Sequence, residues 1–388
     1  MNKKLMAVAV AGALAAPAAV FAQASNVQIY GKLNLAVDNY SATGATAPNS
    51  DIKSRYRVVD SSSRIGFRGT ESLGGGLSAV FLMESGVNVD TGTGLGQSGL
   101  PNVSSGTLSS RIGHVGLQGG WGLLTFGKSN VWWGNFPQEQ AVVLWTNTGV
   151  LPTFGILGRG MSVGVSRQNN LVQYTSPTWG GINAVVSYSP NRQEPVQANA
   201  KADGKLWAVT VQGALGPITG GYDWVKDEAN SPALGNRGST TGNKLRVGWP
   251  YRPGAGVGLY WVSSKLDNGG AGGGGGVDAA SRSLKQTVWG LSWDHLFGNI
   301  RAIAEWGKVS NATGCVTAGA CNDTNATTWL LGANYVFSKR THAYVTYNSI
   351  RNARNYNLDY VAFSHNVVAS LPNGADPRMV AIGMIHNF

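Results

Sequence analysis

Beyond its first two dozen residues, the chain has no apolar run long enough to form a helical membrane span. It also lacks the sustained 3.6-residue apolar stripe that a helical core requires. Charged side chains are scarce, at 13% of the residues, and no linker or change in composition marks a domain boundary along the 388 residues. Because a soluble chain of this length is expected to divide into domains, these absences favour one large closed sheet.

Cysteine is nearly absent as well, since the only two are Cys315 and Cys321 in the segment CVTAGAC. A pair this close in an exported chain is expected to form a disulfide that stiffens a surface loop; two free thiols are the alternative. The five histidines show no metal-ligand spacing, and the Gly-rich run at 269–276 lacks the GK[ST] ending of a phosphate-binding loop. We therefore expect no metal and no cofactor.

The chain begins with a targeting pattern. Lys3 and Lys4 precede an apolar run from Leu5 to Phe21, and small residues follow at Ala22 and Ala24. This order predicts a signal peptide over 1–22 and one mature domain over 23–388; a membrane anchor is the alternative. Without Lys3 and Lys4 the chain has 28 basic and 19 acidic side chains, which is compatible with an anionic partner. Because the protein is exported, we expect no nucleic acid partner.

What the sequence does contain is glycine, aromatic residues and period-two alternation, which together predict many strands. Seven short turns are predicted at Leu73–Gly76, Gly119–Gly122, Pro177–Gly181, Leu215–Pro217, Pro250–Gly256, Phe297–Asn299 and Phe337–Arg340. Each interval between turns holds two strands and a longer polar or Gly-rich segment, a pattern typical of hairpins with long loops at one end. Seven turns, with both chain ends on their side, imply sixteen strands and eight long loops.

The sixteen segments that we interpret as strands are 27–38, 63–70, 77–85, 111–117, 123–128, 171–176, 182–189, 205–214, 218–225, 243–249, 257–265, 286–297, 300–310, 328–337, 342–349 and 379–388. In the first of them, Ile29 and Leu33 share one face while Lys32 and Asn34 share the other. Such two-sided alternation suits a barrel with a lipid-facing apolar band and a polar lumen, because a closed sheet leaves no unpaired edge in lipid. A soluble β-sandwich, with its apolar face turned inward, is the alternative.

Aromatic residues favour the membrane barrel over the sandwich. They gather toward strand ends, as the interfacial girdles of membrane barrels do. The set comprises Trp179, Trp207, Trp224, Trp249, Trp261, Trp289, Trp293, Trp306, Trp329, Tyr222, Tyr260, Tyr335 and Tyr347.

One connection, at 129–168, runs for about forty residues without alternation, which in a compact domain indicates a functional or disordered loop. Its richness in Trp and Phe and its few charges argue against a solvated linker. We expect it to fold into the lumen and narrow it.

Several of these segments resemble the general trimeric porins of the Gram-negative outer membrane, β-proteobacterial type. The resemblance is carried by VQIYGKLNLAVD, SSRIGFRGTESLGGGLSAVFLME, RIGHVGLQGGWGLLTFGKSN, NNLVQYTSPTWGGINAVVSYSP and the last strand, which ends at Phe388. It implies a 16-stranded antiparallel transmembrane β-barrel with short periplasmic turns, long outer loops and a third loop in the lumen. It also implies a multi-pass outer-membrane location, a homotrimer in outer-membrane lipid, and passive diffusion of ions and small hydrophilic solutes. Phe388 resembles the signal read by the outer-membrane insertion machinery.

Alternation and the resemblance together identify candidate pore-wall cations at Lys32, Arg64, Arg68, Arg111 and Lys128. Arg111 faces the lumen only if a bulge shifts its strand, because SSRIGH keeps no clean parity. The candidate constriction-loop residues are Trp132, Trp133, Phe136, Glu139, Trp145, Arg159 and Arg167, with Glu139 as the counter-charge. The excess of basic residues predicts anion preference.

Two features depart from the family pattern. Ile385 and Asn387 occupy places where the family often has basic residues, and the long loop has few acids. Two other functions remain as alternatives: a barrel enzyme of phospholipase or protease type, and a surface adhesin. No Ser, His and Asp set marks the chain as an enzyme, and we expect none.

Overall fold

Residues that alternate in polarity form strands throughout the described part of the chain, because this period places successive side chains on opposite faces of a sheet. The computed structural model describes residues 26–60, 63–87, 89–90, 108–131, 167–190, 204–231, 236–267, 277–278, 281, 283–360 and 371–388. Within these ranges no helix is both long and apolar enough to cross a membrane.

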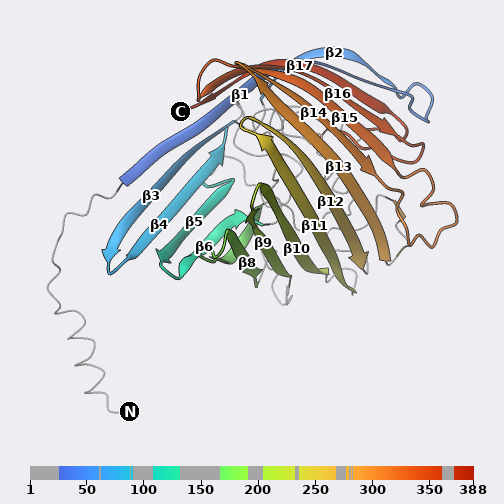
Figure 1. Ribbon diagram of the computed structural model, residues 1–388. Helices are drawn as coiled ribbons and strands as arrows, with labels where there is room; N and C mark the ends of the chain where they lie inside the picture. The colour runs from blue at the N-terminus through green and yellow to red at the C-terminus, as the bar shows by residue number, and fades with distance from the viewer. Residues whose placement is uncertain are drawn as a thin grey trace.

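Seventeen strands in these ranges form a single antiparallel sheet, most of which is seen in Figure 1. They are β1 (Asn26–Thr43), β2 (Ile52–Asp60), β3 (Arg64–Gly74), β4 (Leu77–Gly86), β5 (Ile112–Gly119), β6 (Gly122–Asn130), β7 (Arg167–Thr175), β8 (Ile182–Ser189), β9 (Lys205–Leu215), β10 (Ile218–Ser231), β11 (Asn236–Arg252), β12 (Ala255–Asp267), β13 (Ser283–Phe297), β14 (Ile300–Val309), β15 (Ala326–Val336), β16 (Thr341–Asn352) and β17 (Asp376–Asn387).

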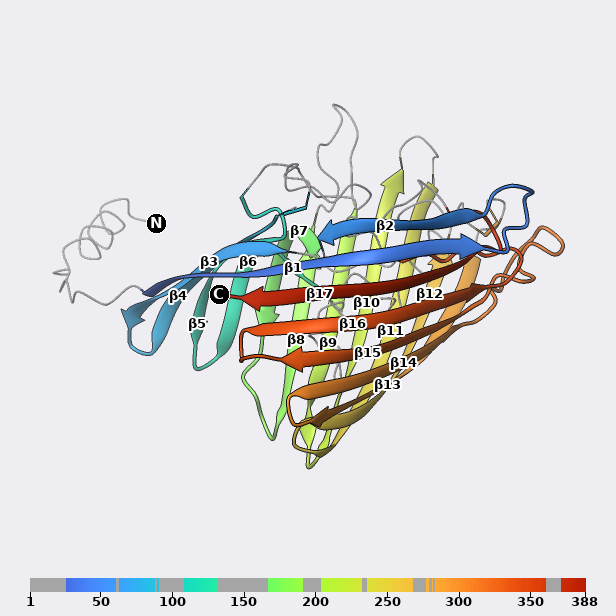
Figure 2. The same cartoon turned by 90° about the horizontal axis from the view of Figure 1, so that it is seen from above.

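The sheet closes where the first strand meets the last. β1 pairs with β17 from Lys32↔Asn387 to Thr43↔Asp376, and Figure 2 shows the two strands side by side. Beyond the end of this ladder, the backbones of Gly31 and Phe388 exchange two hydrogen bonds of 3.1 Å each. The sheet is therefore a closed barrel, which excludes the two-sheet sandwich.

β2 and β3 share one position in the barrel. Both pair with the same edge of β1, β3 along Asn26–Lys32 and β2 along Leu35–Ala42. Between them side chains replace the backbone ladder: the Ser63 N–H donates to the Asp60 carboxylate at 2.9 Å, and the Asn34 N–H donates to Ser63 Oγ at 2.9 Å. Counting this broken strand once confirms the predicted sixteen-stranded barrel.

All seven predicted turns occur as short connections at one end of the barrel, but the strands run further than predicted at the other end. The first strand continues past Asp38 to Thr43, and β2 was missed altogether. In β2 the exposed positions include lysine and arginine as well as Tyr56 and Val58. Near the long loops both faces of a strand contact water, so the ladder continues while the alternation that predicts it is lost.

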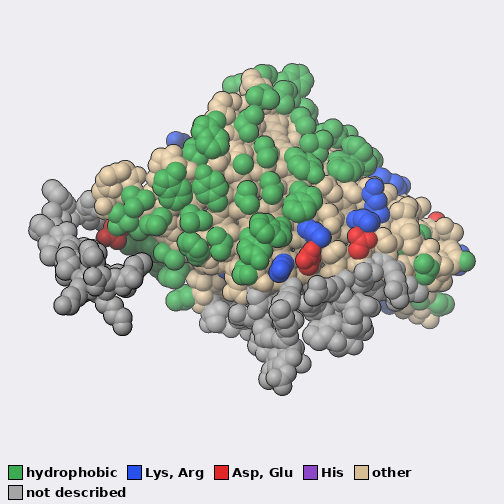
Figure 3. Space-filling model, turned by 90° about the horizontal axis from the view of Figure 1, so that it is seen from below, with side chains coloured by type: hydrophobic (Ala, Val, Ile, Leu, Met, Phe, Trp, Pro, Cys, Tyr) green, Lys and Arg blue, Asp and Glu red, His purple; other side chains and the backbone are tan. Residues whose placement is uncertain are grey.

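The outward face of the barrel is apolar and the inward face is largely polar. Ile29, Leu291, Val345 and Ile382 are among the large hydrophobic side chains exposed on the outside. Figure 3 shows such side chains spread over the barrel wall, with charged side chains gathered toward its edge. The girdle prediction was wrong for Tyr260, which is buried on the lumen side, where its ring covers Gly290 of the adjacent strand. Parity, rather than residue type, sets its direction.

Segments beyond the strands pack over the long-loop end of the barrel. Tyr356 and Leu358, which follow β16, are buried with inward residues of many strands, such as Leu284 of β13. Cys315 and Cys321 are joined by a disulfide in the β14–β15 connection. The backbone N–H groups of Val316 and Thr317 donate to the Asp278 carboxylate at 3.0 Å. This end of the barrel is thus a structured rim.

Candidate functional site: the charged lumen wall

Strand register brings the candidate cations together on the inner wall of β1 to β7. Lys32 and Arg64 are directly paired across β1 and β3, and both side chains point inward because they alternate with lipid-facing residues. We call Lys32, Arg64, Arg111, Lys128 and Arg167 the basic cluster. Its members come from segments up to 135 residues apart, so only the closed sheet assembles it.

Glu84 of β4 lies at the centre of the basic cluster. Its Oε1 accepts a hydrogen bond from Arg111 Nε at 2.7 Å, and its Oε2 lies 3.5 Å from Arg64 Nε. The Tyr30 hydroxyl donates to the same Oε2 at 3.1 Å. The Glu84 and Arg111 side chains are only 8% and 10% exposed, whereas Arg64 remains 29% exposed. One carboxylate therefore fixes two guanidinium groups and leaves one of them open to the lumen.

Arg111 reaches the lumen because it precedes the regular part of β5. Ser109 has a φ of 68°, and the Arg111 N–H donates to the Glu84 carbonyl at 2.9 Å before the ladder begins at Ile112. This irregular entry gives Arg111 a direction that strict alternation does not. The predicted bulge would have turned Arg111 toward the lumen, and the irregular backbone at Ser109–Arg111 has the same effect.

Arg167 was predicted to belong to the long loop, and this was wrong. It is the first residue of β7 and pairs with Asn130 of β6. The ladder continues past a register shift between Gly127 and Ser129, which leaves 131–166 as the connection instead of 129–168. Arg167 is 9% exposed, and both it and Lys128 lie within electrostatic reach of Arg111. Arg167 is thus part of the wall.

Arg68 also faces inward but stands apart from the basic cluster. Its Nε donates to Gln28 Oε1 at 3.0 Å, and its guanidinium lies 5.2 Å from the centre of the Tyr30 ring. Both partners belong to β1, so Arg68 is held against the wall near the short-turn end. Its contacts are exposed to solvent.

The remaining candidates divide into two groups. Phe388 contacts Gly31, as described above. The loop candidates Trp132, Trp133, Phe136, Glu139, Trp145 and Arg159 lie outside the described residues, as does the signal segment 1–22. Their roles stay predictions. Among the described residues, no group of three or more His, Cys, Asp or Glu side chains is arranged to hold a metal ion.

Sequence reasoning missed most of the acidic partners on the lumen wall. Besides Glu84, Asp223 of β10 accepts from Arg246 Nε at 2.9 Å and lies 3.4 Å from Lys244 Nζ, both on β11. Asp294 and Arg301 form another ion pair across β13 and β14. Alternation within KLRV could have identified Lys244 and Arg246 as two cations on one face of the strand. Which acid each cation meets depends on strand register, which a single strand does not reveal.

A closed barrel with an apolar outer band and a charged, hydrogen-bonded lumen defines a transmembrane β-barrel of the pore-forming class. The family model described as "Gram-negative porin" matches residues 7–355. The chain therefore belongs to the Gram-negative porin family and is a multi-pass protein of the outer membrane.

Individual relatives agree with this assignment. The chain is 34% identical over 208 residues to outer membrane porin protein 32 of Delftia acidovorans, which covers 50% of this chain and 52% of that protein. It is 33% identical over 208 residues to an outer membrane porin of Bordetella pertussis, covering 49% of this chain and 48% of that one. The matches thus span about half the length of these relatives.

Solved structures share the fold along nearly the whole chain. An anion-selective porin from Comamonas acidovorans superposes with a TM-score of 0.71 at 22% identity, covering 94% of this chain and all of that one. OmpF of Salmonella typhi, solved with daunomycin, gives a TM-score of 0.61 at 14% identity over 95% of this chain and 99% of that one. At these identities the likeness concerns the fold alone.

Proposed function

We propose that this porin forms a water-filled channel for passive diffusion of ions and small hydrophilic solutes, with a preference for anions. The observation that carries the proposal is the basic cluster, in which Lys32, Arg64, Arg111 and Arg167 lie within electrostatic reach of Glu84 on one wall of the lumen. Charges that line a narrow, partly desolvated passage lower the cost of entry for ions of opposite sign. The solved relative from Comamonas acidovorans is described as anion-selective, which supports the same reading.

The assembly proposed for the channel is a homotrimer in outer-membrane lipid, inserted by the outer-membrane assembly machinery through the strand that ends at Phe388. A trimer form is named for OmpT of Vibrio cholerae, which shares the fold with a TM-score of 0.58. The connection 131–166 is proposed to narrow the lumen. No bond making is required of any of these parts, and we propose no catalytic role.

The test is conductance of the purified, refolded barrel in a planar bilayer, followed by the reversal potential across a KCl gradient. We expect stepwise currents with three sublevels and a reversal potential of the sign set by chloride. Changing Arg64→Gln and Arg111→Gln together should lower the anion-to-cation permeability ratio by roughly two- to fivefold, an effect that shrinks at high salt. Lys53→Gln is the matched control, because Lys53 is an exposed cation of β2 outside the basic cluster.

Two outcomes would contradict the proposal. A reversal potential set by potassium would overturn the anion preference while leaving the channel. A correctly folded barrel that passes no current would overturn the channel itself and favour the alternatives of a barrel enzyme or an adhesin.

A further inference from the structure

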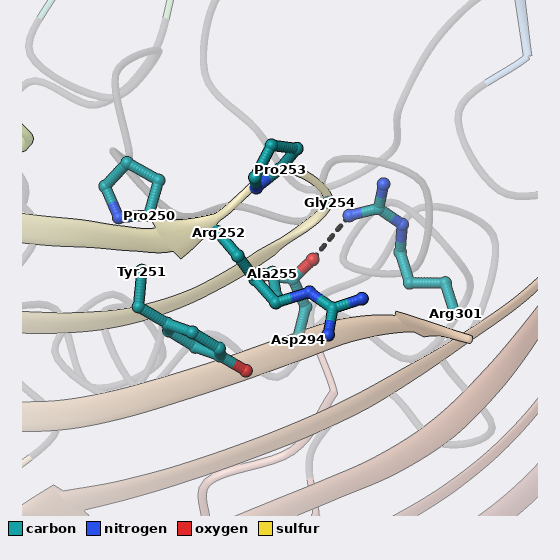
Figure 4. A pocket seen from close by; sticks show the side chains of 8 residues that line it. All are labelled: Pro250, Tyr251, Arg252, Pro253, Gly254, Ala255, Asp294 and Arg301. Carbon is teal, nitrogen blue, oxygen red and sulfur yellow. Dashed lines mark hydrogen bonds and ion pairs between the residues drawn. The ribbon is translucent and has the colours of Figure 1, made fainter. Parts of the chain in front are cut away.

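The turn between β11 and β12 forms one side of an open pocket of about 580 Å³ at the short-turn end of the barrel. The pocket is lined by Pro250, Tyr251, Arg252, Pro253, Gly254, Ala255, Asp294 and Arg301 (Figure 4). Gly254 has a φ of 77°, which the tight turn requires, and its carbonyl accepts a hydrogen bond of 2.9 Å from the Leu296 N–H. This bond ties the turn to β13, so the pocket has a fixed wall.

The opposite wall presents an ion pair. Arg301 of β14 donates to the Asp294 carboxylate of β13, and Figure 4 shows Arg252 reaching from the turn into the same space. Asp294 is 3% exposed and Arg301 24% exposed. The pocket lining therefore holds two guanidinium groups and one carboxylate. Arg252 forms no ion pair with any carboxylate among the residues that the structure describes.

The rest of the lining is apolar and rigid. Pro250, Pro253 and Ala255 carry no polar side chain, and two side-chain contacts of the Tyr251 hydroxyl fix the position of its ring. Its hydroxyl accepts a hydrogen bond of 3.1 Å from Trp293 Nε1 and lies 2.7 Å from His295 Nδ1. Trp293 alternates with Leu291 on the outer face of β13, so the Tyr251 ring packs on that face, and the apolar surface beside the two cations is formed by Pro250, Pro253 and Ala255.

Hydrogen-bonding capacity continues beyond Arg301. Asn334 of β15 lies directly across from Arg301 in the sheet and is fully buried, and neither its amide nitrogen nor its amide oxygen has a hydrogen-bond partner. Buried amides without partners are uncommon, since each costs free energy that a bound polar group recovers. Asn334 thus adds an unused donor and acceptor next to Arg301, although it does not itself line the pocket.

We propose that this pocket binds small organic carboxylates, with Arg252 and Arg301 holding the carboxylate and the two prolines with Ala255 contacting an apolar body. A guanidinium matches the two oxygens of a carboxylate through paired N–H donors. The volume falls in the range of pockets that hold small molecules. The site is distinct from the basic cluster, because it is built by β11, β13, β14 and a turn rather than by β1 to β7.

The test uses sodium benzoate as the probe, measured by calorimetric titration of the detergent-solubilised barrel and by current block in a bilayer. Arg252→Gln should weaken benzoate binding about tenfold, the scale of a hydrogen bond to a charged group. Asp294→Asn should strengthen binding, because it removes the carboxylate that competes for Arg301. The voltage dependence of the block should locate the site near the short-turn end.

The matched control is Lys339→Gln, which removes an exposed cation from another short turn, between β15 and β16. If this change weakens benzoate binding as much as Arg252→Gln does, general rim charge explains the effect and the site is overturned. Binding of inorganic phosphate as tightly as benzoate would overturn the assignment to organic anions, since phosphate has no apolar body. A barrel that conducts but binds no benzoate overturns the site alone, whereas one that binds benzoate without conducting overturns only the channel.

Discussion

At the scale of single residues, Glu84 reduces the net positive charge that the basic cluster presents to the lumen. It is the one acid that contacts two members of the basic cluster among the described ion pairs, and it is itself almost fully buried. A buried ion pair is costly to break, so the cations near Glu84 are held in place. They are also partly neutralised by it.

Replacing Glu84→Gln should therefore raise anion preference. The amide keeps the shape and can still accept a hydrogen bond from Arg111, but the negative charge is lost. We expect the anion-to-cation permeability ratio to increase by about twofold or more, from the Coulomb energy of one charge in a partly screened lumen. The measurement is the reversal potential in a KCl gradient. Glu71→Gln, an exposed acid at the short-turn end of β3, should leave the ratio unchanged. A ratio that falls would contradict the role given to Glu84.

A second residue, Asp359, makes the outer rim sensitive to pH. Its carboxylate accepts hydrogen bonds from the Tyr40 hydroxyl at 3.1 Å and from the Tyr360 N–H at 2.7 Å. Burial raises the pKa of Asp359 to about 6, above its ordinary value of 3.8, although both hydrogen bonds act in the opposite direction. The folded rim thus binds a proton more tightly than the unfolded segment does.

The sign of the effect follows from this raised pKa. The rim segment 353–360 should be most stable below about pH 4 and should lose stability as pH rises through 6, because ionised Asp359 is penalised only when folded. The opening equilibrium should change by up to roughly 100-fold, a factor of ten for each pKa unit. Hydrogen exchange of this segment at pH 4 and pH 7, corrected for intrinsic rates, spans most of this change. Asp359→Asn should abolish the difference, and a pH effect that survives this substitution would implicate another group.

At the scale of elements, β1 is the strand on which closure depends. It pairs with β17 on one edge and with β2 and β3 on the other. At its short-turn end the Phe388 ring lies over Gly31, so that a Cβ at position 31 would overlap the ring and approach the Arg64 carbonyl at 2.8 Å. The absence of a side chain at Gly31 is what admits the terminal aromatic.

Gly31→Ala should consequently destabilise the closed barrel by about 1–3 kcal/mol, the usual cost of overpacking. The denaturant midpoint for loss of the folded band on a cold gel reports the change. Gly120→Ala is a suitable comparison, because Gly120 lies in an exposed turn where a Cβ meets no atom within 4 Å. Equal midpoints for the two variants would mean that the Phe388 ring moves aside without cost.

The sequence was sufficient to predict the strands and turns of the barrel, but it was insufficient to predict which charged side chains contact one another. Alternation and turn residues are local signals, so the sixteen positions and all seven turns were predictable. β2 was missed because lysine and arginine share its exposed positions with apolar residues, and Tyr260 was assigned to the wrong face because its residue type outweighed its parity. Glu84 escaped notice because its meaning comes from Arg64 and Arg111, which only strand register brings to it.

At the scale of the whole molecule, the barrel wall is a single sheet with lipid on its outer face and the water of the lumen on its inner face. Leu291 of β13 is 51% exposed on the outer face, while its neighbour Ser292 points inward opposite Glu305 of β14. Adjacent positions therefore face lipid and water, respectively.

Adding the same charge to these two positions should have unequal effects. Leu291→Arg is expected to cost about 2–4 kcal/mol of folding free energy in a bilayer, because a lipid-facing arginine near the midplane is poorly solvated. Ser292→Arg should cost much less, since the lumen supplies water and Glu305. Equilibrium unfolding in lipid vesicles compares the two directly. Similar losses at both positions would contradict the assignment of Leu291 to the lipid face.

The twelve-residue seam between β1 and β17 also has a bearing on assembly before the barrel is complete. Until the final strand docks, the growing sheet carries two unsatisfied edges whose hydrogen-bonding groups complement each other. The edge of β1 can pair with β17 of its own chain or with β17 of another chain. At high protein concentration, pairing between chains therefore competes with closure of a single barrel. The chance of a correct product then rests on how quickly the two ends of a single chain find each other, and dilution favours the monomeric ring over strand-exchanged aggregates.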